Sequence, residues 1–179
     1  MSKKRSNLEG VLVFSLGAFL LSFVLNLSFE RLSEAIPLIL GVPLFLFVIL
    51  MGIVCDAIGL ASARAKEEPL LSMASRRIRG AREAIWFVRN ASKVSSVFSD
   101  VMGDVAATIS GALAVAMMYK VREWLSGIDL TVTVSLAVGL ASMLSVGGKA
   151  LFKPVALKYA ESIILFLGKT RRAVMGERK

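Results

Sequence analysis

Four stretches of the chain are almost entirely apolar, and each is long enough to cross a membrane as a helix. A transmembrane helix needs roughly 20 mostly apolar residues. The stretches cover residues 10–29, 36–63, 94–119 and 130–152. The pattern therefore predicts an all-α integral membrane protein with four transmembrane helices. The alternative interpretation of the first stretch is a signal peptide. Its apolar run is, however, longer than the ~7–15 residues of a signal peptide's apolar region.

Two other segments have the pattern of helices that lie along a membrane surface. Between the second and third spans, residues 64–93 repeat apolar positions in steps of three and four, which predicts one helical face. These positions are Leu71, Ala74, Ile78, Ala81, Ile85 and Val88. The segment is predicted to be an amphipathic juxtamembrane helix that lies among lipid headgroups or packs on its own membrane domain. Residues 155–168, after the fourth span, are too short to cross the bilayer and predict a short interfacial helix.

The distribution of basic residues predicts the orientation. The chain has 22 Lys and Arg against 13 Asp and Glu. Three basic residues precede the first span, eight lie in residues 64–93, and eight follow from Lys149 onward. The opposite loops contain only Arg31, Lys120 and Arg122. Because basic residues concentrate on the cytoplasmic side, both termini are predicted to be cytoplasmic, in a plasma membrane of the bacterial inner-membrane type, with Tyr119 and Trp124 at the outer interface.

Composition excludes several functional classes. With 56% hydrophobic residues and a mean hydropathy of +0.72, the chain fits a water-soluble domain poorly. A lipid bilayer with anionic headgroups is the partner predicted from the basic segments, and no nucleic acid is predicted because topology accounts for these charges. The chain has no His and a single cysteine, Cys55, so zinc clusters, internal disulfides and His-based catalysis are excluded. We therefore expect no enzymatic activity, and any metal would be held by oxygen atoms.

Ionisable residues inside the spans are the strongest functional signal, because charge is costly in a bilayer and usually faces a bundle interior or a water-filled cavity. At ~1.5 Å per residue, Asp56, Asp100, Asp104 and Lys149 all fall in the cytoplasmic half of the membrane. Asp100 and Asp104 are four residues apart and share a helix face, with Thr108 one turn further. Two interpretations remain open: a cation site, or an ion-pair network in which Lys149 pairs with Asp56 or Asp104.

Small residues form a stripe on the third span. Gly103, Ala107 and Gly111 recur at four-residue spacing. Such a stripe lets two helices approach closely. It predicts either a homodimer through this helix or close packing inside a single bundle.

Three patches of sequence resemble the transmembrane domain of the CNNM/CorC family of magnesium transporters. Residues 56–62, D-A-I-G-L-A-S, resemble the family's S-E-x-A-L-x-S segment, and residues 101–104, V-M-G-D, resemble its L-I-G-N. Residues 148–161, G-K-A-L-F-K-P-V-A-L-K-Y-A-E, resemble its G-E-x-x-P-K-x-x-A-x-x-x-A-E. The resemblance implies a CNNM/CorC-like transmembrane domain over 36–168. Beyond it, the chain is expected to have an amino-terminal tail with an extra transmembrane helix over 1–35 and a basic cytoplasmic tail over 169–179. The family's nucleotide-sensing cytoplasmic domains are not expected.

The resemblance implies a homodimeric domain that transports a cation and holds its metal between helices. At the positions expected to face that metal, this chain has Asp56 where the family has Ser, Asp104 where it has Asn, and Lys149 where it has Glu. Both sets carry one net negative charge, but the placement of charge is reversed. Lys149 is therefore interpreted either as a tethered cation in the place of the metal or as a group that swings aside.

The first hypothesis is a protein that binds or transports a divalent cation through an intramembrane carboxylate site, with Asp56 and Asp104 as ligands. The other residues assigned to the site are Gly103, Asp100 and Thr108, with Lys149 as gate or counter-ion. Mg²⁺ suits this chemistry because it takes few protein carboxylates and keeps several waters, and no other cofactor is expected. The alternative is a non-transporting membrane scaffold or subunit in which Asp56, Asp104 and Lys149 form a structural ion-pair network.

Overall fold

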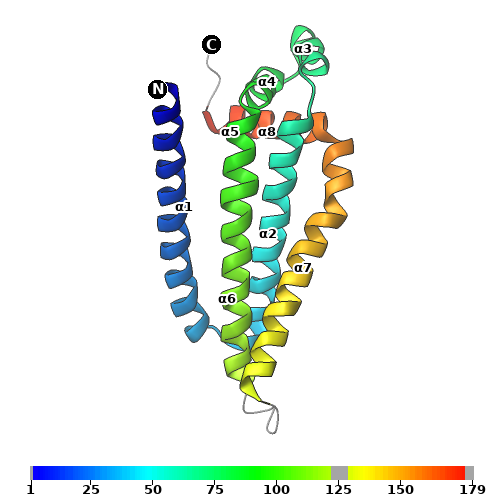
Figure 1. Cartoon of the computed structure of the whole chain (residues 1–179). Helices are drawn as coiled ribbons and strands as arrows, with labels where there is room; N and C mark the ends of the chain where they lie inside the picture. Colours follow the sequence, from blue (N-terminus) through cyan, green and yellow to red (C-terminus); the bar gives the residue numbers. More distant parts are fainter. Residues whose placement is uncertain (1, 122–128, 176–179) are drawn as a thin grey trace. The chain divides into compact units, whose positions relative to one another are not determined.

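The computed structural model describes residues 2–121 and 129–175, and every element in these ranges is a helix. Figure 1 shows their order along the chain. The helices are α1 Ser2–Ala35, α2 Leu38–Arg64, α3 Glu67–Ser75, α4 Ala81–Arg89, α5 Ala91–Ser95, the π-helix η1 Ser96–Met102, α6 Gly103–Val121, α7 Leu130–Lys158 and α8 Ala160–Met175. The predicted all-α class is therefore confirmed.

Three helices in the described residues are long and apolar enough to cross a membrane. They are α2, the continuous helix Ala91–Val121 formed by α5, η1 and α6, and α7. These correspond to the second, third and fourth predicted spans. The first predicted span lies in α1, where the apolar part, Ser15–Phe29, is shorter than a span requires. A fourth crossing thus stays a prediction.

The chain divides into two compact units, to which α2, α6 and α7 each contribute. The first unit comprises Met1–Leu50 and Val105–Ser145. Its buried residues Ala114, Ala137 and Ala141 pack with the larger side chains of Phe45 and Met118. Small residues at such contacts let helix backbones approach closely, which drives helix association where no water is present.

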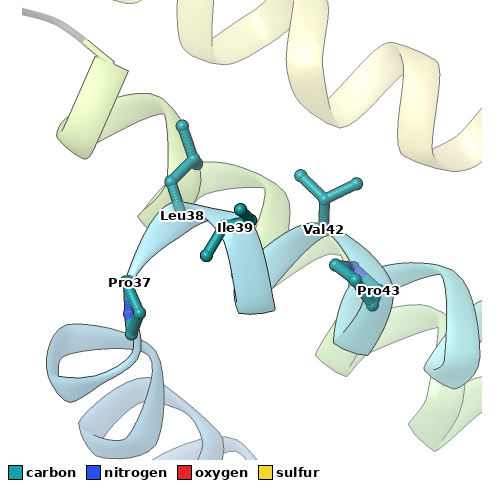
Figure 2. A pocket seen from close by; sticks show the side chains of 5 residues that line it. All are labelled: Pro37, Leu38, Ile39, Val42 and Pro43. Atoms are coloured by element: carbon teal, nitrogen blue, oxygen red, sulfur yellow. The ribbon is translucent and has the colours of Figure 1, made fainter.

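The amino end of α2 follows a proline that ends the preceding helix. Proline disfavours the helical conformation at the residue before it, and α1 ends at Ala35, two residues before Pro37. The Pro37 carbonyl then accepts backbone hydrogen bonds from Leu40 and Gly41 at 3.0 and 3.1 Å. Figure 2 shows the open apolar hollow at this end of the helix, lined by Pro37, Leu38, Ile39, Val42 and Pro43. α2 continues through Pro43 without a break.

The second unit comprises Met51–Asp104 and Val146–Lys179. Its core joins the carboxyl end of α2 to the short helices α3, α4 and α8. The buried members are Ala61, Ala65, Leu70, Ala84, Ile85, Phe87, Val94, Ala160 and Ile164. The apolar face of α4 is therefore used within the protein, which favours the interpretation that this segment packs on its own membrane domain.

The juxtamembrane segment differs from the single stripe predicted between Leu71 and Val88. It contains separate helices because the chain turns between α3 and α4, with positive φ angles at Arg77 (58°) and Gly80 (83°). As a result Ala81 and Ile85 are buried whereas Leu71 and Ile78 are exposed. Apolar periodicity continues across this turn although the helix does not.

The interfacial helix after the last span also differs in its bounds. α7 extends to Lys158 through Pro154, and α8 begins at Ala160 and reaches Met175. Residues 169–175, predicted as part of the basic tail, therefore continue α8. Arg178 and Lys179 lie outside the described residues, as do Arg122 and Trp124 of the predicted outer loop.

Candidate functional site

A carboxylate on one membrane-length helix meets a hydroxyl on another. The Oγ of Ser99, in η1, donates a hydrogen bond to Oδ1 of Asp56, in α2. Both residues are half-buried, and both belong to the second unit. The bond joins residues 43 positions apart and so fixes a tertiary contact. An ionised carboxylate needs such a donor where water is scarce.

Gly59 allows this contact to form. It lies three residues after Asp56 and therefore on nearly the same face of α2. A Cβ placed on Gly59 would lie 2.8 Å from the Cβ of Ser99 and 3.1 Å from its backbone N. Any larger residue would push the two helices apart, so the absence of a side chain at Gly59 places Ser99 within reach of Asp56.

Ser99 lies in the π-helical stretch of the long helix. In a π-helix the backbone bonds run from i to i+5, so side chains after it point in different directions from those of an unbroken α-helix. Short π-helical stretches within longer helices occur frequently at functional sites. Here the stretch spans Ser96–Met102, with Ser99 in the middle and Asp100 next to it, exposed.

Lys149, on α7, belongs to the same unit. Its ammonium nitrogen lies 3.5 Å from the position that a Cβ on Gly103 would occupy. The neighbouring residue Gly148 lies against the side chain of Ile53. Gly59, Gly103 and Gly148 thus mark the contacts of α2 with η1, of α6 with α7, and of α7 with α2. Of the three sequence patches, 101–104 and 148–161 meet at Gly103 and Lys149, whereas 56–62 contacts Ser95 and Ser99 of the long helix.

The structure brings together only some of the predicted site residues. Lys149 forms no ion pair with Asp56 or Asp104 in the part of the chain that the structure describes, and side chains of Asp, Glu and Cys nowhere in that part gather in a group of three that could hold a metal ion. Asp100 and Asp104 are exposed on their helix. Thr108 is also exposed and belongs to the first unit.

Ser99 is the site residue that sequence reasoning missed. A single Ser within an apolar span usually bonds a carbonyl of its own helix, as Ser62 does to Ile58 at 3.0 Å and Ser110 does to Ala107 at 2.8 Å. The available signal was its position next to Asp100 in a helix that also carries Gly103.

Comparison of the chain with protein-family models, with curated proteins and with solved structures finds no match. The resemblance to the CNNM/CorC family stays a prediction from the three sequence patches.

Proposed function

We propose that the chain is an integral membrane protein that binds a cation at Asp56 and Ser99 and moves it through the junction of α2, η1–α6 and α7. One observation carries the proposal. Asp56 lies within a membrane-length apolar helix, and its carboxylate is hydrogen-bonded to a hydroxyl while Lys149 does not neutralise it. An intramembrane carboxylate without a basic partner is by default a group that meets an ion, a proton or water.

A hydrated divalent cation of the Mg²⁺ class fits these ligands. Mg²⁺ is usually bound by one or two carboxylates and keeps several of its waters. The Asp56 carboxylate and the Ser99 hydroxyl supply two oxygen ligands on different helices. A site of this kind requires no cluster of three acidic side chains, which agrees with the arrangement in the described residues.

Lys149 then acts as a competing cation on the third helix. Its ammonium nitrogen lies beside Gly103, at an ordinary van der Waals distance of 3.5 Å from the position that a Cβ there would occupy. A bound metal and Lys149 both carry positive charge. They repel each other, and the repulsion is stronger in a low dielectric than in water. The alternative of a structural ion-pair network is less well supported, because the pairs it requires are not formed by Lys149 in the part described.

The proposal includes four crossings, with α1 as the first, and cytoplasmic termini in a plasma membrane. Its support is the excess of basic residues in residues 64–93 and from Lys149 onward. It also includes a homodimer formed through α6. The dimer is supported by the open space beside Gly111: a Cβ at this position would meet nothing within 4 Å. A second helix could approach closely at such a glycine.

Uptake into proteoliposomes tests the proposed function. The purified protein is reconstituted in vesicles that contain a Mg²⁺-sensitive dye, and uptake is compared among wild type, Asp56→Asn and Ser99→Ala. We expect Asp56→Asn to abolish uptake and Ser99→Ala to reduce it. Asp129→Asn is the matched control. Asp129 directly precedes α7, and its side-chain oxygen Oδ1 accepts a hydrogen bond from the backbone N–H of Thr131 at 2.7 Å. Asn retains this oxygen, so the variant removes the charge and keeps the bond. Uptake by Asp56→Asn equal to that of the control would refute the proposal.

A further inference from the structure

Four polar side chains follow one another along the membrane-length helix Ala91–Val121 at a spacing of four residues. We call them the polar track: Ser92, Ser96, Asp100 and Asp104. All four belong to the second unit. Each reaches the surface, since Ser96 is half-buried and the other three are exposed. Hydroxyl and carboxylate groups are costly against lipid, so this surface of an apolar helix does not suit contact with hydrocarbon.

The π-helix η1 keeps the polar track on one face of the helix. In an α-helix four residues exceed one turn, so residues at this spacing drift around the axis by roughly 40° at each step. In a π-helix the bonds run from i to i+5, so four residues fall short of a turn and the drift is reversed. One such bond joins the Gly103 N–H to the Phe98 carbonyl. The step from Ser96 to Asp100 lies within η1, and it therefore offsets the drift of the α-helical step before it.

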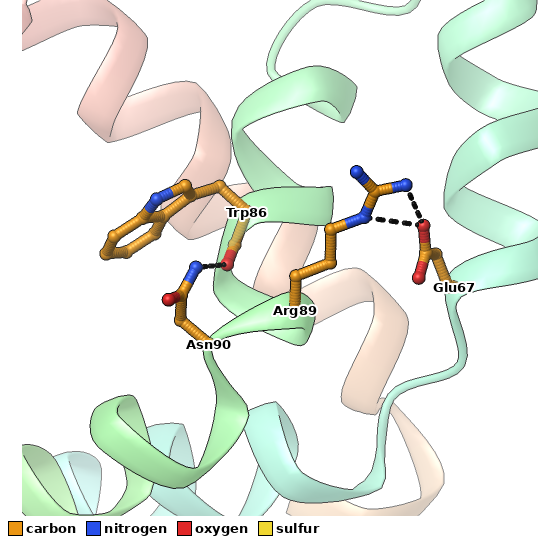
Figure 3. Close-up of polar contacts among 4 residues, drawn as sticks. All are labelled: Glu67, Trp86, Arg89 and Asn90. Carbon is orange, nitrogen blue, oxygen red and sulfur yellow. Dashed lines mark hydrogen bonds and ion pairs between the residues drawn. The ribbon is translucent and has the colours of Figure 1, made fainter.

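Contacts outside the track fix the rotation of the helix at its start. Asn90, directly before α5, donates a side-chain hydrogen bond to the Trp86 carbonyl of α4 at 2.9 Å (Figure 3). Val94, two residues from both Ser92 and Ser96, is buried in the core of the second unit. Because successive residues of an α-helix are about 100° apart, these two serines point away from that core.

Three of the four side chains have no partner within the protein. In the part of the chain that the structure describes, Ser92, Ser96 and Asp100 form no side-chain hydrogen bond or ion pair. Ser62 and Ser110, by contrast, each bond a carbonyl of their own membrane-length helix. A hydroxyl or a carboxylate without a protein partner inside a membrane requires water.

The polar track meets the candidate site at Ser99. Ser96 lies one turn before Ser99 and Asp100 directly follows it, so both border the hydroxyl that is bonded to Asp56. The other end of the track, Ser92, is the second residue of the helix and lies close in sequence to α4. The track thus extends from the end of the helix that joins the juxtamembrane segment to the candidate site.

We propose that the polar track is a water-filled path that leads a hydrated cation from this end of the helix to Asp56. Mg²⁺ gives up its waters reluctantly, so the hydroxyls of Ser92 and Ser96 bond to water around the ion, and Asp100 attracts the ion by its charge. The presence of water in the path requires only the membrane location, whereas the passage of the cation rests on the proposed function.

Reaction of single cysteines with a cationic methanethiosulfonate, a water-soluble reagent, tests the path in the reconstituted full chain. The buried Cys55 is first replaced by alanine. We expect Ser96→Cys to react at least about tenfold faster than Val97→Cys, because the reactive thiolate forms in water and is disfavoured in apolar surroundings. Val97 is the matched control, since it is the next residue of η1, lies outside the track and is 39% exposed. Ser92→Cys should react at least as fast as Ser96→Cys.

Protection by Mg²⁺ tests whether the cation uses the path. Saturating Mg²⁺ should slow the reaction of Ser96→Cys several-fold, and adding Asp56→Asn should remove this protection. Equal reaction rates of Ser96→Cys and Val97→Cys would overturn the inference. So would cross-linking of two chains through Ser96→Cys without reaction with the reagent, because a second copy would then cover the track. No protection by Mg²⁺, with uptake that still depends on Asp56, would overturn the path and leave the proposed function in place. Fast reaction with uptake independent of Asp56 would refute the proposed function and leave the water-filled path in place.

Discussion

Replacement of Gly59 by alanine tests the geometry of the candidate site most sharply. The added methyl group would lie 2.8 Å from the Cβ of Ser99, closer than real Cβ contacts, and 3.3 Å from the carbonyl oxygen of Ser95. Both neighbours belong to the helix that carries the hydroxyl partner of Asp56. The helices must separate to admit the methyl group, and the hydrogen bond between Ser99 and Asp56 then lengthens or breaks.

The expected cost has two parts. Overpacking of a close helix contact costs about 1–3 kcal/mol, and loss of a hydrogen bond to a charged group costs about 1.5–3 kcal/mol. We therefore expect Gly59→Ala to lower the free energy of unfolding by about 2.5–6 kcal/mol. Gly147→Ala, on α7, is the matched control: a Cβ there meets nothing within 4 Å. Its effect should be at most about 1 kcal/mol, in the stabilising direction of helix propensity.

Reversible unfolding in mixed detergent micelles, followed by circular dichroism as the mole fraction of sodium dodecyl sulfate rises, measures these differences. A double-mutant cycle with Ser99→Gly identifies the cause. Because Ser99→Gly removes the Cβ that the new methyl group meets, Gly59→Ala should cost less in that background than in the wild type. An equal cost in both backgrounds, or an effect of Gly59→Ala no larger than that of Gly147→Ala, would refute the reasoning.

Three further predictions concern other contacts of the second unit. Gly80→Ala should lower the free energy of unfolding by at least about 1–2 kcal/mol in the same micelle assay, because the positive φ is strained for alanine and the backbone N of Lys169 lies in the way. Glu67→Gln should change it by less than about 1 kcal/mol, since its partner Arg89 is 64% exposed and water screens the pair. Lys149→Ala should tighten Mg²⁺ binding up to about tenfold, equivalent to about 1.4 kcal/mol, in equilibrium dialysis, because it removes a competing positive charge. Weaker binding by that variant would show that the lysine supports the site.

Features set by length and composition were predictable from the sequence. Residues 36–63, 94–119 and 130–152 were predicted as spans, and each overlaps almost completely with a membrane-length helix of the structure. A long apolar run leaves no other structure available in lipid, because every backbone group needs a hydrogen bond within its own segment. The boundaries moved by a few residues because polar residues such as Lys158 continue a helix without loss of backbone bonding.

Features set by local backbone geometry were not predictable. The turn before Gly80 interrupts a regular apolar repeat, and periodicity carries no information on the φ angle of one residue. The pairing of Ser99 with Asp56 depends on the π-helix Ser96–Met102, in which α-helical spacing no longer decides which residues share a face. For the same reason, the four-residue spacing of Asp100 and Asp104 did not indicate that Ser99 would be the residue bonded to Asp56.

Isothermal titration of the detergent-solubilised protein with Mg²⁺ tests the central claim most directly. The wild type is compared with Asp56→Asn, which removes the charge and keeps the shape of the side chain, and with Asp129→Asn as the control for the same chemical change. We expect saturable binding by the wild type and by Asp129→Asn, and loss of binding by Asp56→Asn. Binding by Asp56→Asn with the affinity of the wild type would contradict the claim that this carboxylate holds the cation.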